Sequence, residues 1–173
     1  NWKKLYSMMG VQGYSKSDCE VIIHMYLKYG IEQTLLMLDG VFAFIMVDTN
    51  NKNIYIARDT YGVRPLFVQK NASSWMFASE LKQLIDVMYI SKKYQFQPGT
   101  YSKISYSFSN TSSSNETIFK EVIENKQFRL NTQPIHSSYS NYTVDDYCQM
   151  INKSLTEAVK KRVNNTDREI ACL

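Results

Sequence analysis

The sequence is poor in residues that break or cross-link a chain, with 3 prolines, 6 glycines and 3 cysteines among its 173 residues. So little proline and glycine excludes collagen-like and linker proteins. Hydrophobic residues make up 44% of the chain and charged residues 21%, which supplies a core and excludes a disordered protein. No apolar run approaches the roughly 18 residues of a membrane span, and the first residues lack the apolar stretch of a signal peptide.

Neither the net charge nor the cysteines indicate a specialised class of protein. A net charge of +4 is too small an excess to argue for nucleic-acid binding. The cysteines, Cys19, Cys148 and Cys172, are odd in number and widely spaced, which excludes a disulfide framework. No pair has the spacing of zinc ligands. We therefore expect a reducing compartment, the cytoplasm, and no metal site.

Hydrophobic periodicity separates one helix from a set of strands. Residues 17–30 have apolar positions at helical spacing, with Ser17 and Glu20 as a capping box and Gly30 at the stop. Short apolar runs joined by polar turns follow, and they predict an antiparallel sheet. The predicted strands are 41–47, 54–57, 66–68, 75–78 and 99–106.

The rest of the chain alternates polar stretches with amphipathic ones. Residues 79–87 predict a helix capped by Ser79. Residues 107–116 and 131–142 are poor in apolar residues and predict exposed loops, the second of which is the expected domain boundary. A long helix with one apolar stripe is predicted from its cap at Thr143 to Val163, followed by a buried strand at 169–173.

Few residues carry a pattern that chemistry requires. His24 lies near the apolar face of the first helix, and we expect it to be packed or solvated. A helix N-terminus lowers the pKa of a thiol, but Asp18 and Glu20 flank Cys19 and oppose this, so we expect a structural role for it. Asp18 has two open interpretations: a favourable interaction with the helix dipole, or a carboxylate that faces a site and binds an ammonium group.

The densest polar cluster lies between two predicted strands. Arg58 and Asp59 precede a turn at Gly62, an order that suits a fixed, hydrogen-bonded corner. A purely structural turn and the frame of a site both remain open. Ser79 and Glu80 pose the same choice, because capping the predicted helix would suffice to explain them.

Several segments resemble one enzyme family. The stretch from Met37 to Phe67, MLDGVFAFIMVDTNNKNIYIARDTYGVRPLF, closely resembles glutamine-hydrolysing asparagine synthetases, and the eukaryotic type more than the bacterial one. Further segments follow in the family's order: SDCEVI, YGIEQTLLMLDG, ASELKQLI, QPGTY and AVKKRVNNTDREIACL. Together they span nearly the whole chain, and only the region around 107–142 matches poorly.

The resemblance implies an α+β chain that covers parts of two domains. Residues 1–130 would form the C-terminal half of an N-terminal-nucleophile (class II) glutamine amidotransferase sandwich with antiparallel sheets, and 131–142 a linker. Residues 143–173 would form the first helix and strand of an α/β ATP-pyrophosphatase synthetase domain. The catalytic cysteine and the pyrophosphate loop are then expected outside this piece, which would be inactive by itself.

The resemblance also implies a reaction and a few site residues. In the parent enzyme, ammonia from glutamine amidates aspartate through a β-aspartyl-AMP, with ATP and Mg²⁺. Asp18 matches the residue that binds the α-amino group of glutamine, and Leu173 matches one whose main chain contacts the adenine nucleotide. Neither a catalytic residue nor a metal ligand is expected in this piece. Five residues match a structural signature near the site: Arg58, Asp59, Gly62, Ser79 and Glu80.

The expected partners are therefore glutamine, aspartate and ATP, without nucleic acid or membrane, and homodimerisation is left open. Two alternatives remain. One is another class II amidotransferase, such as the amidophosphoribosyltransferase or the glucosamine-6-phosphate-forming enzyme, or a β-lactam-forming or peptide-modifying relative with a synthetase domain. The other is a non-catalytic, amidotransferase-like binding module.

Overall fold

The computed structural model describes residues 1–15, 17–71, 74–84, 91–111, 114–129, 142–164 and 169–171. Contacts divide the chain into two compact units, residues 1–131 and 132–173. The elements, in chain order, are α1 (Trp2–Met9), α2 (Glu20–Met37), β1 (Ala43–Asp48), β2 (Asn53–Arg58), β3 (Phe67–Lys70), β4 (Trp75–Ala78), the 3-10 helix η1 (Leu81–Leu84), β5 (Lys92–Gln95), β6 (Thr100–Thr111), β7 (Ser114–Gln127) and α3 (Val144–Val163).

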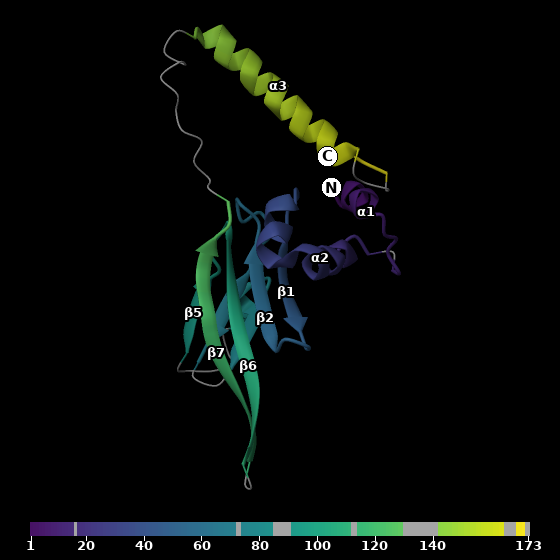
Figure 1. Ribbon diagram of the computed structural model, residues 1–173. Helices are drawn as coiled ribbons and strands as arrows, with labels where there is room; N and C mark the ends of the chain where they lie inside the picture. The colour runs from purple at the N-terminus through teal and green to yellow at the C-terminus, as the bar shows by residue number, and fades with distance from the viewer. Residues whose placement is uncertain are drawn as a thin grey trace. The chain divides into compact units, whose positions relative to one another are not determined.

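Two antiparallel sheets form most of the first unit (Figure 1). One has the strand order β1-β2-β6-β7 and the other β4-β3-β5, and every described pairing is antiparallel. The antiparallel arrangement and five of the strands (β1, β2, β3, β4 and β6) confirm the prediction. The sequence analysis missed the short elements β5 and α1, and it also missed β7.

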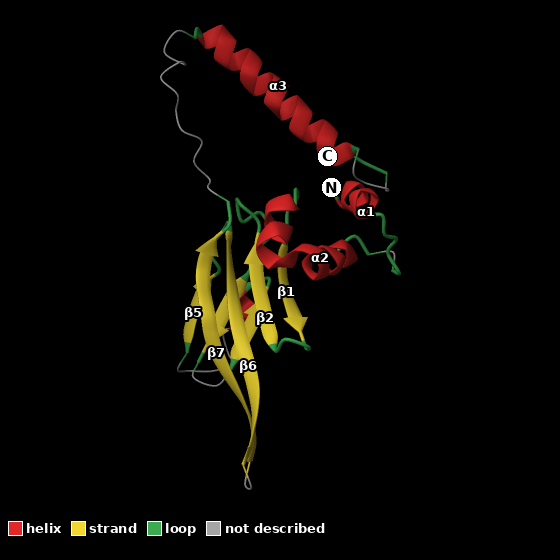
Figure 2. Cartoon of the chain, viewed as in Figure 1, coloured by secondary structure: helices red, strands yellow, loops and turns green. Residues whose placement is uncertain are grey.

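A hydrophobic core lies between the two sheets. Ile56 of β2, Val68 of β3 and Ile104 of β6 are all buried in it. Successive residues of a strand point to opposite faces, so Ala57 of β2 packs instead against α1 and α2, on the other face of the four-stranded sheet. The described unit therefore has a helical layer, a four-stranded sheet and a three-stranded sheet (Figure 2).

Helix α2 has a break where the sequence predicts its end. Gly30 has a φ of 76°, a backbone conformation that favours glycine. The helix resumes at once, and the Thr34 hydroxyl donates to the Gly30 carbonyl at 2.7 Å. The break thus redirects the helix, so that Leu35 joins Met25 in the core under the helices.

The predicted capping box at the start of α2 is wrong. The helix begins at Glu20 with Cys19 as its N-cap residue, and no described side chain caps it. The Ser17 hydroxyl instead accepts from the Cys19 N–H at 3.3 Å. Because Glu20 is the first helical residue and not the third, its carboxylate reaches back to the backbone of residues 14 and 15.

The predicted exposed loop at 107–116 is also wrong, because β6 and β7 continue through it as a hairpin. The strands pair from Thr100 opposite Gln127 to Thr111 opposite Ser114, and residues 112 and 113 lie outside the described residues. A solvent-exposed two-stranded ribbon needs no buried face, so low apolar content does not exclude strands here. Tyr106 and Phe108, both in β6, lie edge to face, and this aromatic contact stabilises the ribbon within one strand.

Other predictions fall partly outside the described residues. Of the α-helix predicted at 79–87, residues 81–84 form the 3-10 helix η1 instead, and residues 85–87 lie outside the described residues. The linker at 131–142 is outside except for Tyr142. Of the strand predicted at 169–173, the described residues 169–171 are exposed and irregular. A strand needs a neighbour for its backbone hydrogen bonds, and no described strand pairs with them.

Helix α3 forms as the sequence predicts. The Thr143 hydroxyl accepts from the Asp146 N–H at 3.3 Å, and the Asp146 carboxylate accepts from the Thr143 N–H at 2.8 Å, which makes a reciprocal capping box. The carboxylate also accepts from the Thr143 hydroxyl at 2.7 Å, and this bond, followed by the one from the N–H, lowers the pKa of Asp146. The predicted apolar stripe is largely exposed within this unit. None of the described helices is long and apolar enough to cross a membrane.

We predict that Met25→Ala lowers the free energy of unfolding by about 2–5 kcal/mol, because Met25 is fully buried and its removal leaves a cavity. Met8→Ala is the matched control, since Met8 is 48% exposed, and it should change the value by less than about 0.5 kcal/mol. Denaturant unfolding of both variants measures the difference. Equal effects would contradict the described packing of α2.

Candidate functional site

The chain passes from β2 to β3 through a corner at residues 58–66, and the Arg58 guanidinium lies at its centre. Arg58 is only 3% exposed. Its Nε donates to the Arg64 carbonyl at 2.8 Å, its Nη1 to the Phe96 carbonyl at 2.6 Å and its Nη2 to the Gly62 carbonyl at 2.7 Å. Because the guanidinium is planar and rigid, it fixes three carbonyls from two separate segments.

Asp59 supplies the complementary set of acceptors. Its Oδ1 accepts from the N–H groups of Tyr61 and Val63 at 3.2 and 2.9 Å. Its Oδ2 accepts from those of Phe42 and Arg64 at 3.2 and 3.1 Å. Four backbone donors thus satisfy a carboxylate that is 2% exposed. The bond from Phe42 also ties the start of β1 to the corner.

Gly62 closes the corner at a position that excludes a side chain. It has a φ of 64°, and a Cβ atom there would lie 2.7 Å from Pro98 Cγ and 2.8 Å from Arg58 Cζ. Its N–H donates to the Asp59 carbonyl at 3.0 Å. The structure therefore brings Arg58, Asp59 and Gly62 into one rigid unit, and its predicted place beside a substrate site stays a prediction.

Ser79 and Glu80 lie at the end of the three-stranded sheet that the corner enters. They follow β4, whose last residue, Ala78, pairs with Phe67, the first residue of β3. Both are exposed, and Glu80 forms an ion pair with Lys82 at 2.5 Å. An exposed pair of this kind contributes little to stability.

Asp18 lies in the segment between α1 and α2, two residues before α2 begins. Its side chain is exposed, and within the described residues its one hydrogen bond is from Cys19 Sγ to Oδ1 at 3.6 Å. No described hydrogen bond links it to the corner. The carboxylate therefore keeps most of its acceptor capacity, which an ammonium group requires of its partner.

Cys19 does not have the character of a nucleophile. Burial raises the pKa of its thiol, and the negative charge of Asp18 raises it further. Nucleophilic cysteines need the opposite shift, because the thiolate is the reactive form. The raised pKa thus argues against a nucleophilic role, and the structural role expected from the sequence stays a prediction.

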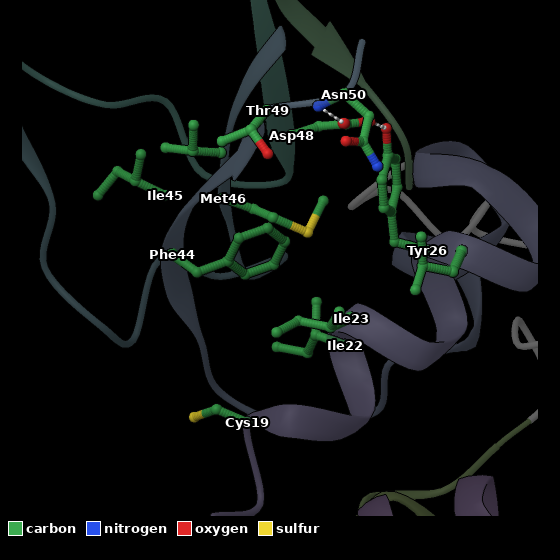
Figure 3. Close-up of a pocket in the computed structure, with 12 residues that line it drawn as sticks. Cys19, Ile22, Ile23, Tyr26, Phe44, Ile45, Met46, Asp48, Thr49 and Asn50 are labelled. Carbon is green, nitrogen blue, oxygen red and sulfur yellow. Dashed lines mark hydrogen bonds between the residues drawn. The ribbon is translucent and has the colours of Figure 1, made fainter. Parts of the chain in front are cut away.

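Two hollows border this region, and the sequence analysis singled out neither. One, of about 370 Å³, includes Ser17, the neighbour of Asp18. The other, of about 440 Å³, is an apolar groove between α2 and β1 (Figure 3). At one end of this groove the Tyr26 hydroxyl donates to Asp48 Oδ2 at 2.5 Å and so lowers the pKa of Asp48 to about 2. No sequence pattern predicts that residues 22–27 and residues 44–50 line one groove, because this depends on how α2 crosses β1.

The nucleotide contact predicted at Leu173 is not tested by the described residues, because Leu173 lies outside them. No three His, Cys, Asp or Glu side chains among the described residues lie close enough to hold a metal ion. The part of the chain that the structure describes thus supplies no ligand set for Mg²⁺.

We predict that Asp59→Asn lowers the free energy of unfolding by at least about 2 kcal/mol. Either orientation of the amide turns an NH₂ group toward two backbone N–H groups, and leaving a buried donor unsatisfied costs about 1–3 kcal/mol. Asp18→Asn is the same substitution at an exposed carboxylate and should stay within about 0.5 kcal/mol. Thermal unfolding compares the two, and a tolerant Asp59 would refute the four-donor geometry.

Comparison with known proteins identifies relatives of this chain. The profile of the family described as glutamine amidotransferase domain matches residues 1–142. Asparagine synthetase [glutamine-hydrolyzing] of Homo sapiens is 34% identical over 185 aligned residues, which cover 100% of this chain and 32% of the human protein. The enzymes of Bos taurus and Gallus gallus are 35% and 34% identical over the same coverage. The chain thus spans about a third of the length of these relatives.

Solved structures share the fold at lower identity. The glutamine phosphoribosylpyrophosphate amidotransferase of B. subtilis aligns with a TM-score of 0.54 and 23% identity over 75% of this chain and 26% of that one. A structure described as the allosteric regulatory enzyme of purine biosynthesis aligns with a TM-score of 0.54 and 22% identity over 76% and 27%. They confirm the α+β, class II amidotransferase fold with antiparallel sheets. Because the family profile also covers 142 of the 173 residues, the chain belongs to the family of glutamine amidotransferase domains.

Proposed function

We propose that this chain is part of a glutamine-hydrolysing asparagine synthetase. The observation that carries the proposal is the extent of the sequence similarity. The amidotransferase profile ends at residue 142, whereas the similarity to the human enzyme covers the whole chain and so includes α3. An amidotransferase joined to a different synthetic domain has no reason to share that helix. The phosphoribosylpyrophosphate amidotransferase, at 23% identity, supports the fold only.

In the glutaminase half of this reaction, we assign Asp18 to the α-ammonium group of glutamine. Its exposed carboxylate and the positive ammonium would form a charge-assisted hydrogen bond, which orients the substrate as well as binding it. The attack on the side-chain amide requires a thiolate. We assign that thiolate to a part of the protein outside these residues, as the resemblance implies, and the raised pKa of Cys19 supports this.

The corner has a supporting role in the proposal. Arg58 and Asp59 are buried and bonded to backbone groups, so neither is available to a substrate. Their effect is to hold the two sheets in fixed relation. We therefore assign them to the scaffold and not to the chemistry.

The synthetase half belongs to the proposal for the whole protein. There ATP would activate aspartate and ammonia would displace AMP to give asparagine. The described residues supply no ligand set for Mg²⁺, so we assign ATP, Mg²⁺ and aspartate to sites formed elsewhere in the protein. The exposed free thiols of Cys19 and Cys148 support a reducing compartment, and we propose the cytoplasm.

The test is an assay of the full reading frame that contains this chain, with ATP, aspartate and either glutamine or ammonia. We expect glutamine-dependent formation of asparagine with release of AMP and pyrophosphate. Glutamine hydrolysis without any asparagine would favour another amidotransferase. A protein inactive with both nitrogen sources would favour the non-catalytic binding module.

We predict that Asp18→Ala in that protein raises the KM for glutamine about tenfold to a hundredfold, because hydrogen bonds to charged groups contribute about 1.5–3 kcal/mol. Synthesis from ammonia should be spared, since ammonia needs no carboxylate partner. Asp145→Ala, at an exposed aspartate of α3, is the matched control and should change neither activity. An equal loss of both activities in Asp18→Ala would make Asp18 structural.

A further inference from the structure

The Glu20 carboxylate holds the segment that precedes Asp18. Its Oε1 accepts from the Tyr14 N–H at 2.6 Å, and its Oε2 accepts from the Ser15 N–H at 2.6 Å and the Ser15 hydroxyl at 2.5 Å. The side chain is only 13% exposed. These bonds lower the pKa of Glu20 to about 2, and the bond from the Ser15 hydroxyl has the largest effect. The acceptor therefore stays charged throughout the neutral range.

His24, one turn further along α2, adds a second attachment. Its Nε2 lies 3.2 Å from Glu20 Oε1, and its ring stacks on Tyr14 with centroids 6.2 Å apart and planes inclined by 27°. The Tyr6 ring meets the His24 ring edge to face, with centroids 5.9 Å apart. The backbone of residues 14–15 and the Ser15 hydroxyl are thus fixed to α2, whereas the Tyr14 ring stays 96% exposed.

A hydrogen-bonded relay continues from Glu20 to both neighbours of Asp18. The Ser15 hydroxyl donates its proton to Glu20, which leaves the lone pairs of the Ser15 oxygen free to accept. This oxygen accepts from the Ser17 N–H at 3.2 Å. The Ser17 hydroxyl in turn accepts from the Cys19 N–H at 3.3 Å. Asp18 lies between two residues that are tied down, while its own carboxylate remains exposed.

We infer that Glu20 is a positioning residue for Asp18 and acts on it through Ser15 and Ser17. The inference rests on the proposed function, in which Asp18 binds the ammonium group of glutamine. A binding carboxylate must be held close to its productive position by the groups around it, or ordering it consumes binding energy. Among the described residues, Asp18 receives only a weak bond from a thiol, so the backbone on either side has to supply this order.

The helix dipole alone does not account for Glu20. A carboxylate in the first turn of a helix is favourable wherever it points. The dipole does not explain why this carboxylate takes three donors from residues 14 and 15, outside the helix. Nor does it explain why one of those donors is a hydroxyl that passes the restraint on to Ser17.

The test uses the full-length protein and measures synthesis from glutamine and from ammonia. In Glu20→Gln, the amide can accept from only one of the two N–H groups, and we expect the KM for glutamine to rise about tenfold with the ammonia-dependent kcat unchanged. Ser15→Ala keeps the charge of Glu20 but removes the relay, and it should raise the KM about threefold or more. Glu124→Gln, at an exposed glutamate of β7, is the control and should change neither activity.

A double variant separates positioning from a general structural role. If Glu20 acts through Asp18, the KM of Asp18→Asn/Glu20→Gln should equal that of Asp18→Asn alone within about twofold. Multiplying effects would overturn the inference, as would an equal fall of both activities in Glu20→Gln and Ser15→Ala. An unchanged KM in Glu20→Gln together with a raised KM in Asp18→Asn would also overturn the inference. That result would not contradict the proposed function. An unchanged KM in Asp18→Asn itself would instead remove the assignment of Asp18, and the inference with it.

Discussion

Two buried charges of opposite sign, Arg58 and Asp59, hold the corner at which the chain leaves one sheet and enters the other. A buried charge is costly unless it is paired and hydrogen-bonded, and here the partners are backbone groups. The guanidinium takes three carbonyls and the carboxylate four N–H groups. A corner has no strand ladder to pair its polar backbone groups. These two buried side chains pair them instead, and so fix the path of the chain from β2 to β3.

Glu20 likewise pairs polar backbone groups in the segment between α1 and α2. That segment also lacks regular backbone hydrogen bonds, and one carboxylate satisfies two consecutive N–H groups and a hydroxyl. The difference lies in what surrounds the two devices. At the corner the two charged side chains are themselves buried, so their bonds govern stability. The segment held by Glu20 ends at an exposed carboxylate, so the same type of bond governs where Asp18 lies.

The sequence predicts well where its patterns are local. Apolar runs and polar turns located β1, β2, β3 and β4, and the order of Arg58, Asp59 and Gly62 indicated a hydrogen-bonded corner. It failed where structure depends on a distant partner. The end of the β6–β7 hairpin is rich in Ser, Thr and Asn, and only its pairing across the turn makes it strand. Ser17 and Glu20 have the spacing of a capping box, but Glu20 finds donors at residues 14 and 15 that no spacing rule includes.

The geometry also bears on the two interpretations that the sequence left open for Asp18. The effect of a helix dipole falls off beyond the first turn, and α2 begins only at Glu20, with Cys19 as the N-cap residue. Among the described contacts, the Asp18 carboxylate accepts no backbone N–H of that turn. The charge nearest the helix end belongs to Glu20, whose oxygens already have their donors. The exposed Asp18 carboxylate therefore keeps acceptor capacity for an ammonium group, as its proposed role requires.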